Sequence, residues 1–320
     1  MAWRYINPGY VHLLDADAQA TATQYKSYDN SKTGVAFSQT NYYSAGITIA
    51  DFIEGNDFWA RFDVYIPNST NGAVYCYAPY TYRSGFNLTL NTSKFSILIE
   101  RAGSAAKYIA ESISWSRAWE YGLKRNAINS ILIHAKYVTD DGYWIEININ
   151  GTKTTYSPND SRRNWDYNAN YKYAILYAYS ANPVSNIIFS NEEINIKEQV
   201  VTLPVGTTET AMNAQEGGIY LADNVGQTLL QTIDASALIS QYGSDSKVTG
   251  IALVGNPAYR TGEQLSSLTA ISKSGGVTTE HGTANLSDAS DTVIWQGFSV
   301  ASDTTIADLQ NMQLGWKAGE

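Results

Sequence analysis

The sequence predicts an all-β protein built from two β-sandwich domains, and three observations point to this fold class. Apolar and polar side chains alternate with a period of two along residues 129–156, as they do in half-buried antiparallel strands. Turn signals separate these alternating segments, and in the C-terminal part they recur about every ten residues. Only 16% of the residues are charged, whereas Tyr and Trp are abundant, at 24 and 8. This composition is typical of a surface-exposed β protein rather than of a metabolic enzyme.

Residues 129–156 are expected to form a three-strand meander. The apolar face of its first two segments carries Ile131, Ile133, Ala135, Tyr137, Tyr143, Ile145, Ile147 and Ile149. Asn150-Gly151 follows, and this pair favours a two-residue hairpin turn because both central positions need positive φ. One face of the meander should be covered by a second sheet, and the other should contact solvent.

Shorter strands are predicted before the meander, at residues 33–37, 46–53, 58–66, 73–78, 86–90 and 95–100. In the strand at 58–66, alternate residues from Phe58 to Ile66 should face the core, and the solvent side should carry Trp59, Arg61, Asp63 and Tyr65. Proline cannot donate to a β-ladder, so Pro67 ends this strand.

Two segments of the first domain lack a period-two pattern. Residues 101–128 are the least regular part, and Trp115, Trp119 and Leu123 have helical spacing there. This spacing indicates either one short helix ending near Gly122 or a loop that crosses between the sheets. Residues 157–171 form a long polar loop, of the kind that often carries function on a rigid sandwich. Strands at 173–179 and 185–190 then close the domain.

The domain boundary is expected within residues 197–206, where Pro204 and Gly206 interrupt the pattern and the composition changes. The first domain would then span residues 1–198, and a smaller structural or assembly domain residues 199–320. Six alternating segments predict its strands: GIYLADN, TLLQTIDAS, KVTGIALVG, SLTAISK, TVIWQGFSVAS and MQLGWKA. Residues 304–310 are expected to form one helical turn.

The bulk properties exclude several classes of partner. A net charge of −9 argues against nucleic acid and against anionic membrane surfaces. Cys76 is the only cysteine, so neither an internal disulfide nor a structural zinc site of thiolates is expected. The sequence has no run of about 18 apolar residues and no N-terminal signal pattern. We therefore expect a protein made in the cytoplasm and released by lysis, as virion parts are.

Residues 28–194 resemble the concanavalin A-like lectin/glucanase superfamily, including its laminin-G-like modules. The resemblance rests on FWARFDVYIP, the pair SILIHAKYV and YWIEININGTKTTY, and the closing SNIIFSNEEI. It implies a jelly-roll sandwich for the first domain, and it is unspecific for function. The C-terminal WQGFSVASDTTIADLQNMQLGWKAG resembles small β-sandwich domains of bacteriophage tail and fibre proteins. That second resemblance implies a virion structural or host-recognition protein.

Glucanases of this superfamily carry paired carboxylates on one strand face, a nucleophile and a general acid. The nearest match here is Glu146-Ile147-Asn148-Ile149-Asn150, in which two of the three outward residues are amides. Amides neither attack nor protonate at neutral pH. His134 lies in mid-strand and is expected to be a solvated or sheet-covering side chain. The sequence therefore predicts a protein without enzymatic activity.

Carbohydrate binding is the function that the polar aromatic segments favour. Sugars stack on aromatic rings and accept hydrogen bonds from polar side chains. The candidate contact residues are Tyr80, Tyr82, Arg83, Trp115, Trp119, Trp165, Asp166 and Tyr167, with Arg162 and Arg163 beside them, and the outward strand residues Trp59, Tyr65 and Trp144. Subunit contacts are an equally good explanation for any one of these aromatics, because Trp and Tyr also anchor protein interfaces.

No cofactor is expected, with calcium as the one open possibility. Asp140-Asp141 and Asn159-Asp160 could supply carboxylate ligands. Asp-Asp-Gly is also a common turn sequence, and we favour that explanation.

Three functions remain open at this point. The first is a phage or phage-like structural protein, in the tail, a fibre or a surface decoration, with a lectin-like module for carbohydrate or the host surface. The partners would be a cell-surface glycan or other virion proteins, with a homo-oligomer expected and no membrane insertion. The alternatives are a glycoside hydrolase of the glucanase branch and a bacterial surface adhesin.

Overall fold

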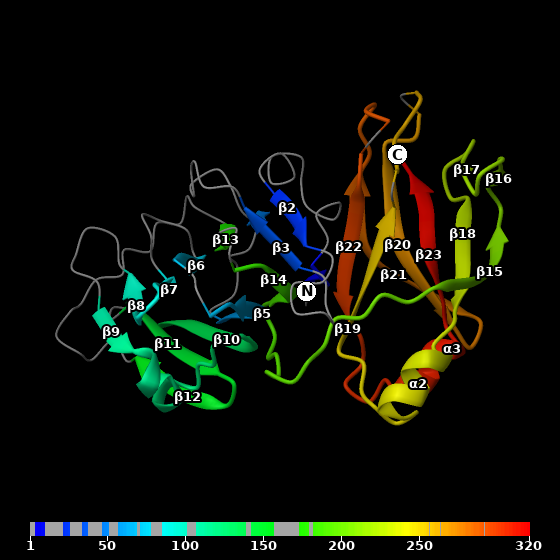
Figure 1. The fold of residues 1–320 in the computed structure, drawn as a ribbon. Helices are drawn as coiled ribbons and strands as arrows, with labels where there is room; N and C mark the ends of the chain where they lie inside the picture. Colours follow the sequence, from blue (N-terminus) through cyan, green and yellow to red (C-terminus); the bar gives the residue numbers. More distant parts are fainter. Residues whose placement is uncertain are drawn as a thin grey trace. The chain divides into compact units, whose positions relative to one another are not determined.

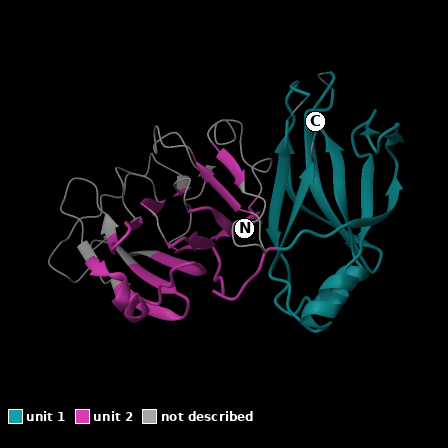
Figure 2. Ribbon diagram, viewed as in Figure 1, with its two compact units in different colours: residues 1–5, 201–320 teal, residues 6–200 magenta. Residues whose placement is uncertain are grey.

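The computed structural model describes two compact units (Figure 2). The N-terminal unit comprises residues 6–200, and the C-terminal unit comprises residues 1–5 and 201–320. The described residues are 4–9, 22–25, 34–37, 47–50, 57–68, 71–77, 85–100, 107–138, 142–156, 173–178, 182–255, 257–262, 264–290 and 292–320. Strands dominate both units, which confirms the predicted all-β class (Figure 1).

Two antiparallel sheets form the sandwich of the N-terminal unit. The first sheet runs in the order β12 (Thr152–Tyr156), β11 (Gly142–Ile149), β10 (Ala127–Val138), β5 (Asp57–Ile66), β14 (Val184–Ser190), β3 (Gly34–Phe37) and β2 (Ala22–Tyr25), and β1 (Arg4–Asn7) pairs with β14. The second runs in the order β4 (Ile47–Ala50), β13 (Tyr173–Ala178), β6 (Gly72–Tyr77), β7 (Gly85–Leu90), β8 (Lys94–Glu100) and β9 (Lys107–Ser114). Strands far apart in sequence, such as β5 and β14, are neighbours, so the topology requires crossovers between the sheets.

The predicted meander is confirmed as β10, β11 and β12. Ile133 pairs with Ile147, and both side chains are buried in the core. Asn150 and Gly151 have φ angles of 51° and 96° and connect β11 to β12, as the two-residue turn requires. The alternating apolar residues therefore fix the register and the buried face of this sheet.

The outer face of β5 is not the solvent-exposed face that the alternation predicts. Arg61 and Asp63 are 0% and 1% exposed, and they form an ion pair of 2.8 Å between Arg61 Nη2 and Asp63 Oδ1. The cause is residues 191–200, because Ile194 packs there with Leu132 and Ile188. The Arg61 Nε–H donates to the Ile196 carbonyl oxygen at 3.3 Å, which ties this segment to the buried pair.

Residues 107–128 are more regular than predicted. They contain β9 and the 3-10 helix η2 (Trp115–Tyr121), so a short helix forms, and it lies on the connection that crosses from the second sheet to the first. The pattern of β9 is obscured because its pairing with β8 shifts register twice and Ser112 has a φ of 51°. Such irregularities break the period of two on which a strand prediction depends.

The C-terminal unit contains one large sheet, two small ones and two short helices. The five-stranded sheet runs in the order β15 (Val205–Thr210), β18 (Thr228–Ile233), β23 (Gln313–Gly319), β20 (Ser267–Ser274) and β21 (Val277–Asn285). The small sheets pair β19 (Gly250–Gly255) with β22 (Ile294–Ser299), and β16 (Asn213–Ala214) with β17 (Tyr220–Leu221). The helices are α2 (Ser236–Tyr242) and α3 (Ile306–Gln310).

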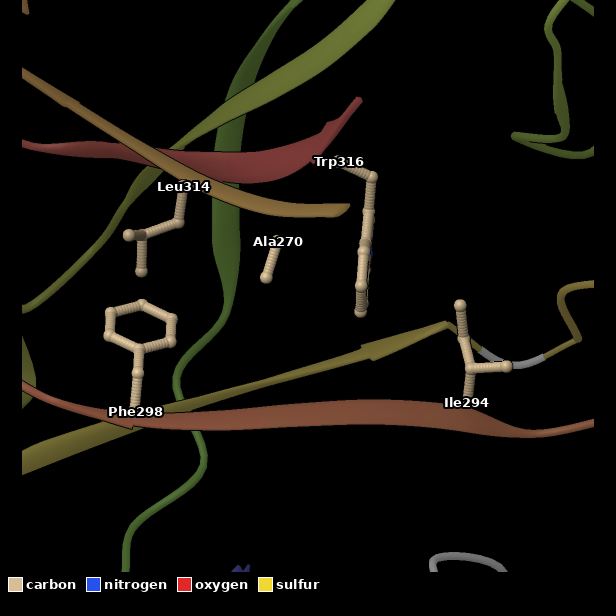
Figure 3. Close-up of a cluster of buried hydrophobic side chains, with 5 residues drawn as sticks. All are labelled: Ala270, Ile294, Phe298, Leu314 and Trp316. Carbon is tan, nitrogen blue, oxygen red and sulfur yellow. The ribbon is translucent and has the colours of Figure 1, made fainter. Parts of the chain in front are cut away.

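The core of this unit lies between the five-stranded sheet and the β19–β22 pair. Ala270, Leu314 and Trp316 point from the large sheet toward Ile294 and Phe298 of β22 (Figure 3). All six predicted strands have counterparts, and α3 confirms the helical turn predicted at 304–310. The threonine-rich edge strands β15 and β21 lack apolar alternation, and helix α2 directly follows the strand segment TLLQTI, so the sequence pattern did not reveal these three elements.

Among the described residues, no helix is long and apolar enough to cross a membrane.

Candidate functional site

Trp119 of the N-terminal unit has a large apolar side chain that is not packed against the protein. Its side chain is 74% exposed, more than that of any other large apolar residue in the described part of the chain. A tryptophan left in water forgoes a large hydrophobic stabilisation, and exposed Trp is enriched where proteins bind partners. We therefore take the surface around Trp119 as the candidate site.

The 3-10 geometry of η2 turns Trp119 outward. A 3-10 helix has about three residues per turn, so residues three apart share a face. Trp115, Ala118 and Tyr121 form one such row, which faces the protein, whereas Ser116 and Trp119 form another row, which is exposed. The remaining row carries the ion pair of Arg117 Nη2 with Glu120 Oε2 at 2.7 Å.

Trp115 is occupied by contacts inside the protein. Its indole N–H donates to the Asn91 carbonyl oxygen at 2.9 Å, and its ring lies 5.1 Å from that of Phe95. The guanidinium carbon of Arg125 lies 4.9 Å from the Trp115 ring centroid, which is a cation–π contact. Both tryptophans of η2 were predicted to touch sugar, but only Trp119 has a free surface, whereas Trp115 holds the helix against the β7–β8 turn.

Gly122 ends η2 at a position that only glycine fits. It has a φ of 76°, and a Cβ atom there would lie 2.1 Å from the Ile149 carbonyl oxygen. This close approach brings the end of η2 against the β11–β12 hairpin. The Leu123 amide donates to the Ala118 carbonyl oxygen at 3.0 Å, and both side chains are buried.

A network of side-chain amides connects the end of η2 to β10 and to the β11–β12 turn. The Asn150 Nδ2 group donates to the Gly122 carbonyl oxygen at 2.7 Å and to Asn129 Oδ1 at 2.9 Å. Asn129 in turn accepts from the Lys124 amide and donates to the Lys124 carbonyl oxygen, each at 2.8 Å. These hydrogen bonds tie the residues that follow η2 to the meander.

The electrostatics of η2 are dominated by its own ion pair. A hydrogen bond from Arg117 lowers the pKa of Glu120, and the same bond raises the pKa of Arg117. Both groups are solvent-accessible, so water and salt weaken the pair. Because Glu120 is already paired with Arg117, its negative charge does not balance the other cations near η2.

A second polar cluster lies on the outer face of the first sheet. The Trp59 and His134 rings stack with centroids 3.7 Å apart, and His134 Nε2 lies 2.9 Å from Asp57 Oδ1. His134 therefore covers the sheet, as predicted. The predicted contact residue Tyr65 donates through its hydroxyl to Asn126 Oδ1 at 2.9 Å.

Glu146 and its neighbours on β11 are engaged in local contacts. Its carboxylate binds Lys153 Nζ at 2.9 Å. Asn148 Oδ1 accepts the Gly151 amide hydrogen at 2.9 Å, and Asn150 Oδ1 accepts from the Ser130 amide at 2.9 Å. Asn148 and Asn150 therefore stabilise the β11–β12 hairpin.

The C-terminal unit holds a serine–histidine pair that the sequence did not reveal. Ser272 Oγ lies 2.8 Å from His281 Nε2, and the imidazole stacks on Phe298 with ring centroids 3.6 Å apart. Burial alone lowers the pKa of His281, and within the described residues no carboxylate orients its ring. A catalytic serine needs an oriented base, so this pair serves to pack β21 against β22.

The other predicted contact residues cannot be placed on this surface. Outside the described residues lie Tyr80, Tyr82, Arg83, Arg162, Arg163, Trp165, Asp166, Tyr167, the loop at 159–160, and the candidate calcium ligands Asp140 and Asp141. The backbone of Trp144 pairs with Lys136, and its side chain is not described. Within the described part of the chain, no group of three or more His, Cys, Asp or Glu residues could hold a metal ion.

Fold and site together define a two-unit all-β protein with an exposed aromatic platform on its N-terminal sandwich. No protein-family model and no curated protein matches the sequence.

Solved structures give only distant likenesses. An endo-β-1,4-glucuronan lyase from the fungus Trichoderma reesei is 7% identical, with 58% of this chain and 92% of that chain covered and a TM-score of 0.34. Sheep galectin-11 is 7% identical over 45% of this chain and 96% of its own, with a TM-score of 0.30. The receptor-binding domain of botulinum neurotoxin type G is 10% identical over 95% and 94%, with a TM-score of 0.34. Likenesses at this level carry no argument about the function of this chain.

Proposed function

We propose that this protein is a non-catalytic recognition protein whose N-terminal unit binds carbohydrate through the surface around Trp119. The exposure of Trp119 is the observation that carries the proposal. An indole ring offers a flat apolar face to the C–H groups of a pyranose ring, and polar groups beside it can bind the hydroxyls. The fixed η2 helix favours affinity, because a preorganised platform loses little conformational entropy on binding.

The first test is a glycan array probed with the full-length protein and three variants. We expect Trp119→Ala to abolish binding and Trp119→Phe to retain part of it, because phenylalanine keeps a smaller stacking face. Tyr259→Ala removes an aromatic that is 41% exposed in the other unit, and this control should bind like the wild type. Equal binding by wild type and Trp119→Ala, or no binding to any glycan, would overturn the proposal.

The alternative role for Trp119 is a contact between subunits, and a mass measurement in solution distinguishes it. If the ring serves glycan alone, Trp119→Ala should leave the oligomeric state unchanged across protein concentration. A smaller particle for the variant than for the wild type would assign Trp119 to a subunit interface. A homo-oligomer formed through other surfaces is compatible with the glycan-binding role.

We place this recognition protein in a phage or phage-like virion, as a tail, fibre or decoration component. The support is its sequence: an acidic, disulfide-free, charge-poor β protein rich in Tyr, with a C-terminal part resembling tail and fibre domains. Mass spectrometry of purified particles should find the chain as a tightly bound component. Recovery only as a free cytosolic monomer would argue against this placement, and recovery on the bacterial surface would favour an adhesin.

Glycoside hydrolysis is the enzymatic alternative, and Glu146 is the residue on which it would depend. The ion pair of Glu146 with Lys153 and the amides at positions 148 and 150 support a non-catalytic role instead. A glycan panel incubated with wild type and Glu146→Gln tests this directly. We expect no turnover by either protein, and turnover that disappears in Glu146→Gln would establish the enzyme.

A further inference from the structure

Cations outnumber carboxylates in the segment that carries Trp119 and in the turn beside it, although the chain as a whole carries a net charge of −9. Residues 91–94 and 114–126 contain four cations, Lys94, Arg117, Lys124 and Arg125, and one carboxylate, Glu120. A local excess of one charge on a protein of opposite net charge indicates the charge of the ligand.

Hydrogen bonds bring these two segments together. Trp115 donates its backbone amide to the Ser93 carbonyl oxygen at 3.4 Å and its indole N–H to the Asn91 carbonyl oxygen. The Arg125 Nη2 group donates to the Thr92 carbonyl oxygen at 3.2 Å. Lys94 pairs with Ser114 in the β8–β9 ladder, directly before η2. Arg117 therefore lies on η2, Lys124 and Arg125 follow the end of this helix, and Lys94 begins the neighbouring strand β8.

Three of the four cations have no carboxylate partner within the described residues. Lys94 and Lys124 are exposed, and the backbone of Lys124 is held on both sides by Asn129. Arg125 is held over Trp115, and in the described part of the chain its buried Nε–H lacks a hydrogen-bond acceptor. The Arg125 Nη2 group donates to the Thr92 carbonyl oxygen, and in the described part of the chain no carboxylate balances the charge of this guanidinium.

We propose that the ligand of the Trp119 surface is an acidic oligosaccharide, whose carboxylate or sulfate groups meet Lys94, Lys124 and Arg125 while one sugar ring stacks on Trp119. This inference rests on the proposed carbohydrate-binding function and specifies its ligand class. Stacking supplies most of the affinity, and the cations select the charged glycan over its neutral counterpart. Because two of the cations are exposed, their contribution decreases as salt is added.

A matched pair of ligands tests the charge preference. Oligogalacturonate and its methyl-esterified form have the same sugar rings, and only the first is charged. We expect the full-length protein to bind the acid more tightly than the ester, with the difference decreasing between low and high salt. Lys124→Gln and Lys94→Gln should each weaken binding of the acid by about two- to fivefold and leave binding of the ester unchanged. Lys197→Gln removes an exposed cation of the segment 191–200 and should have no effect.

The outcomes separate this inference from the function on which it rests. Equal affinity for acid and ester, with no effect of the two lysine variants, overturns the acidic ligand and leaves carbohydrate binding intact. Binding of only neutral glycans on the array would likewise overturn the acidic ligand and leave carbohydrate binding intact. If Trp119→Ala retains full binding of the acid, the acid binds elsewhere and the inference fails. If no glycan of either kind binds, both proposals fail.

Discussion

At the scale of single residues, the site depends on two tryptophans with the same sequence spacing and different roles. In an α-helix, residues four apart lie on one face, whereas in a 3-10 helix they lie about 120° apart. The sequence spacing of Trp115 and Trp119 therefore did not predict that one would be packed and the other exposed. The 3-10 type of the helix makes that distinction, and Gly122 ends the helix against the β11–β12 hairpin.

The two tryptophans should differ in their effect on stability. Trp119→Ala should change the free energy of unfolding by less than about 0.5 kcal/mol, because its ring contributes little packing. Trp115→Ala removes the contacts with Phe95, Arg125 and the Asn91 carbonyl oxygen, and we expect a loss of about 2–3 kcal/mol. Denaturant unfolding of both variants measures the difference, and a larger loss for Trp119→Ala would contradict the assigned roles.

His281 should make the C-terminal unit sensitive to mild acid. Because burial lowers the pKa of His281 below its ordinary value, the unfolded chain takes up a proton more readily than the folded chain. The stabilisation by neutral His281 is therefore complete above about pH 6.5 and is lost as the pH falls through the folded pKa. Chemical unfolding at pH 7.5 and 5.5 should show a smaller acid effect in His281→Gln than in wild type, and an equal effect in both would contradict the prediction.

At the scale of elements, the β11–β12 hairpin connects the fold to the candidate site. Asn150 supplies the left-handed turn residue and also hydrogen-bonds Gly122 at the end of η2. Asn150→Ala should lower stability by about 2–3 kcal/mol, through strain at positive φ and the lost hydrogen bonds. Asn150→Gly removes the strain and keeps the loss of hydrogen bonds, so it should be less destabilised in the same unfolding measurement. Equal destabilisation of the two variants would exclude a role for backbone strain.

For some strands the sequence pattern predicts which side chains are buried, and for others it does not. The alternation in β5, β10 and β11 was enough to predict their core faces, because burial between two sheets follows the period of two. The same alternation wrongly placed Arg61 and Asp63 in solvent. Their burial depends on residues 191–200 packing over β5, more than 120 positions away along the chain. No local pattern contains that information.

The candidate site was predictable only in part, for a related reason. Aromatic content indicated Trp115 and Trp119, but exposure distinguishes them only in three dimensions. The cations Lys124 and Arg125 follow these tryptophans in the same short stretch of sequence, and the uneven charge distribution could have revealed them. Lys94 joins them only through the pairing of β8 with β9.

At the scale of the whole molecule, each unit has its own hydrophobic core. Phe62 is fully buried in the N-terminal unit, and Phe298 belongs to the core of the C-terminal unit (Figure 3). We expect calorimetry of the full chain to resolve two transitions, one shifted by Phe62→Ala and the other by Phe298→Ala, each by about 3–5 kcal/mol of stability. A single transition that both variants lower equally would show that the units unfold as one.

The proposed carbohydrate-binding function depends on direct contact between a glycan and Trp119. Fluorine NMR of the 5-fluorotryptophan-labelled protein measures this contact, because the resonance missing in Trp119→Phe identifies Trp119 among the 8 tryptophans. On titration with oligogalacturonate or with a glycan that the array selects, the Trp119 resonance should shift in proportion to occupancy, while that of buried Trp316 stays in place. Saturable binding with an unmoved Trp119 resonance would contradict the central claim.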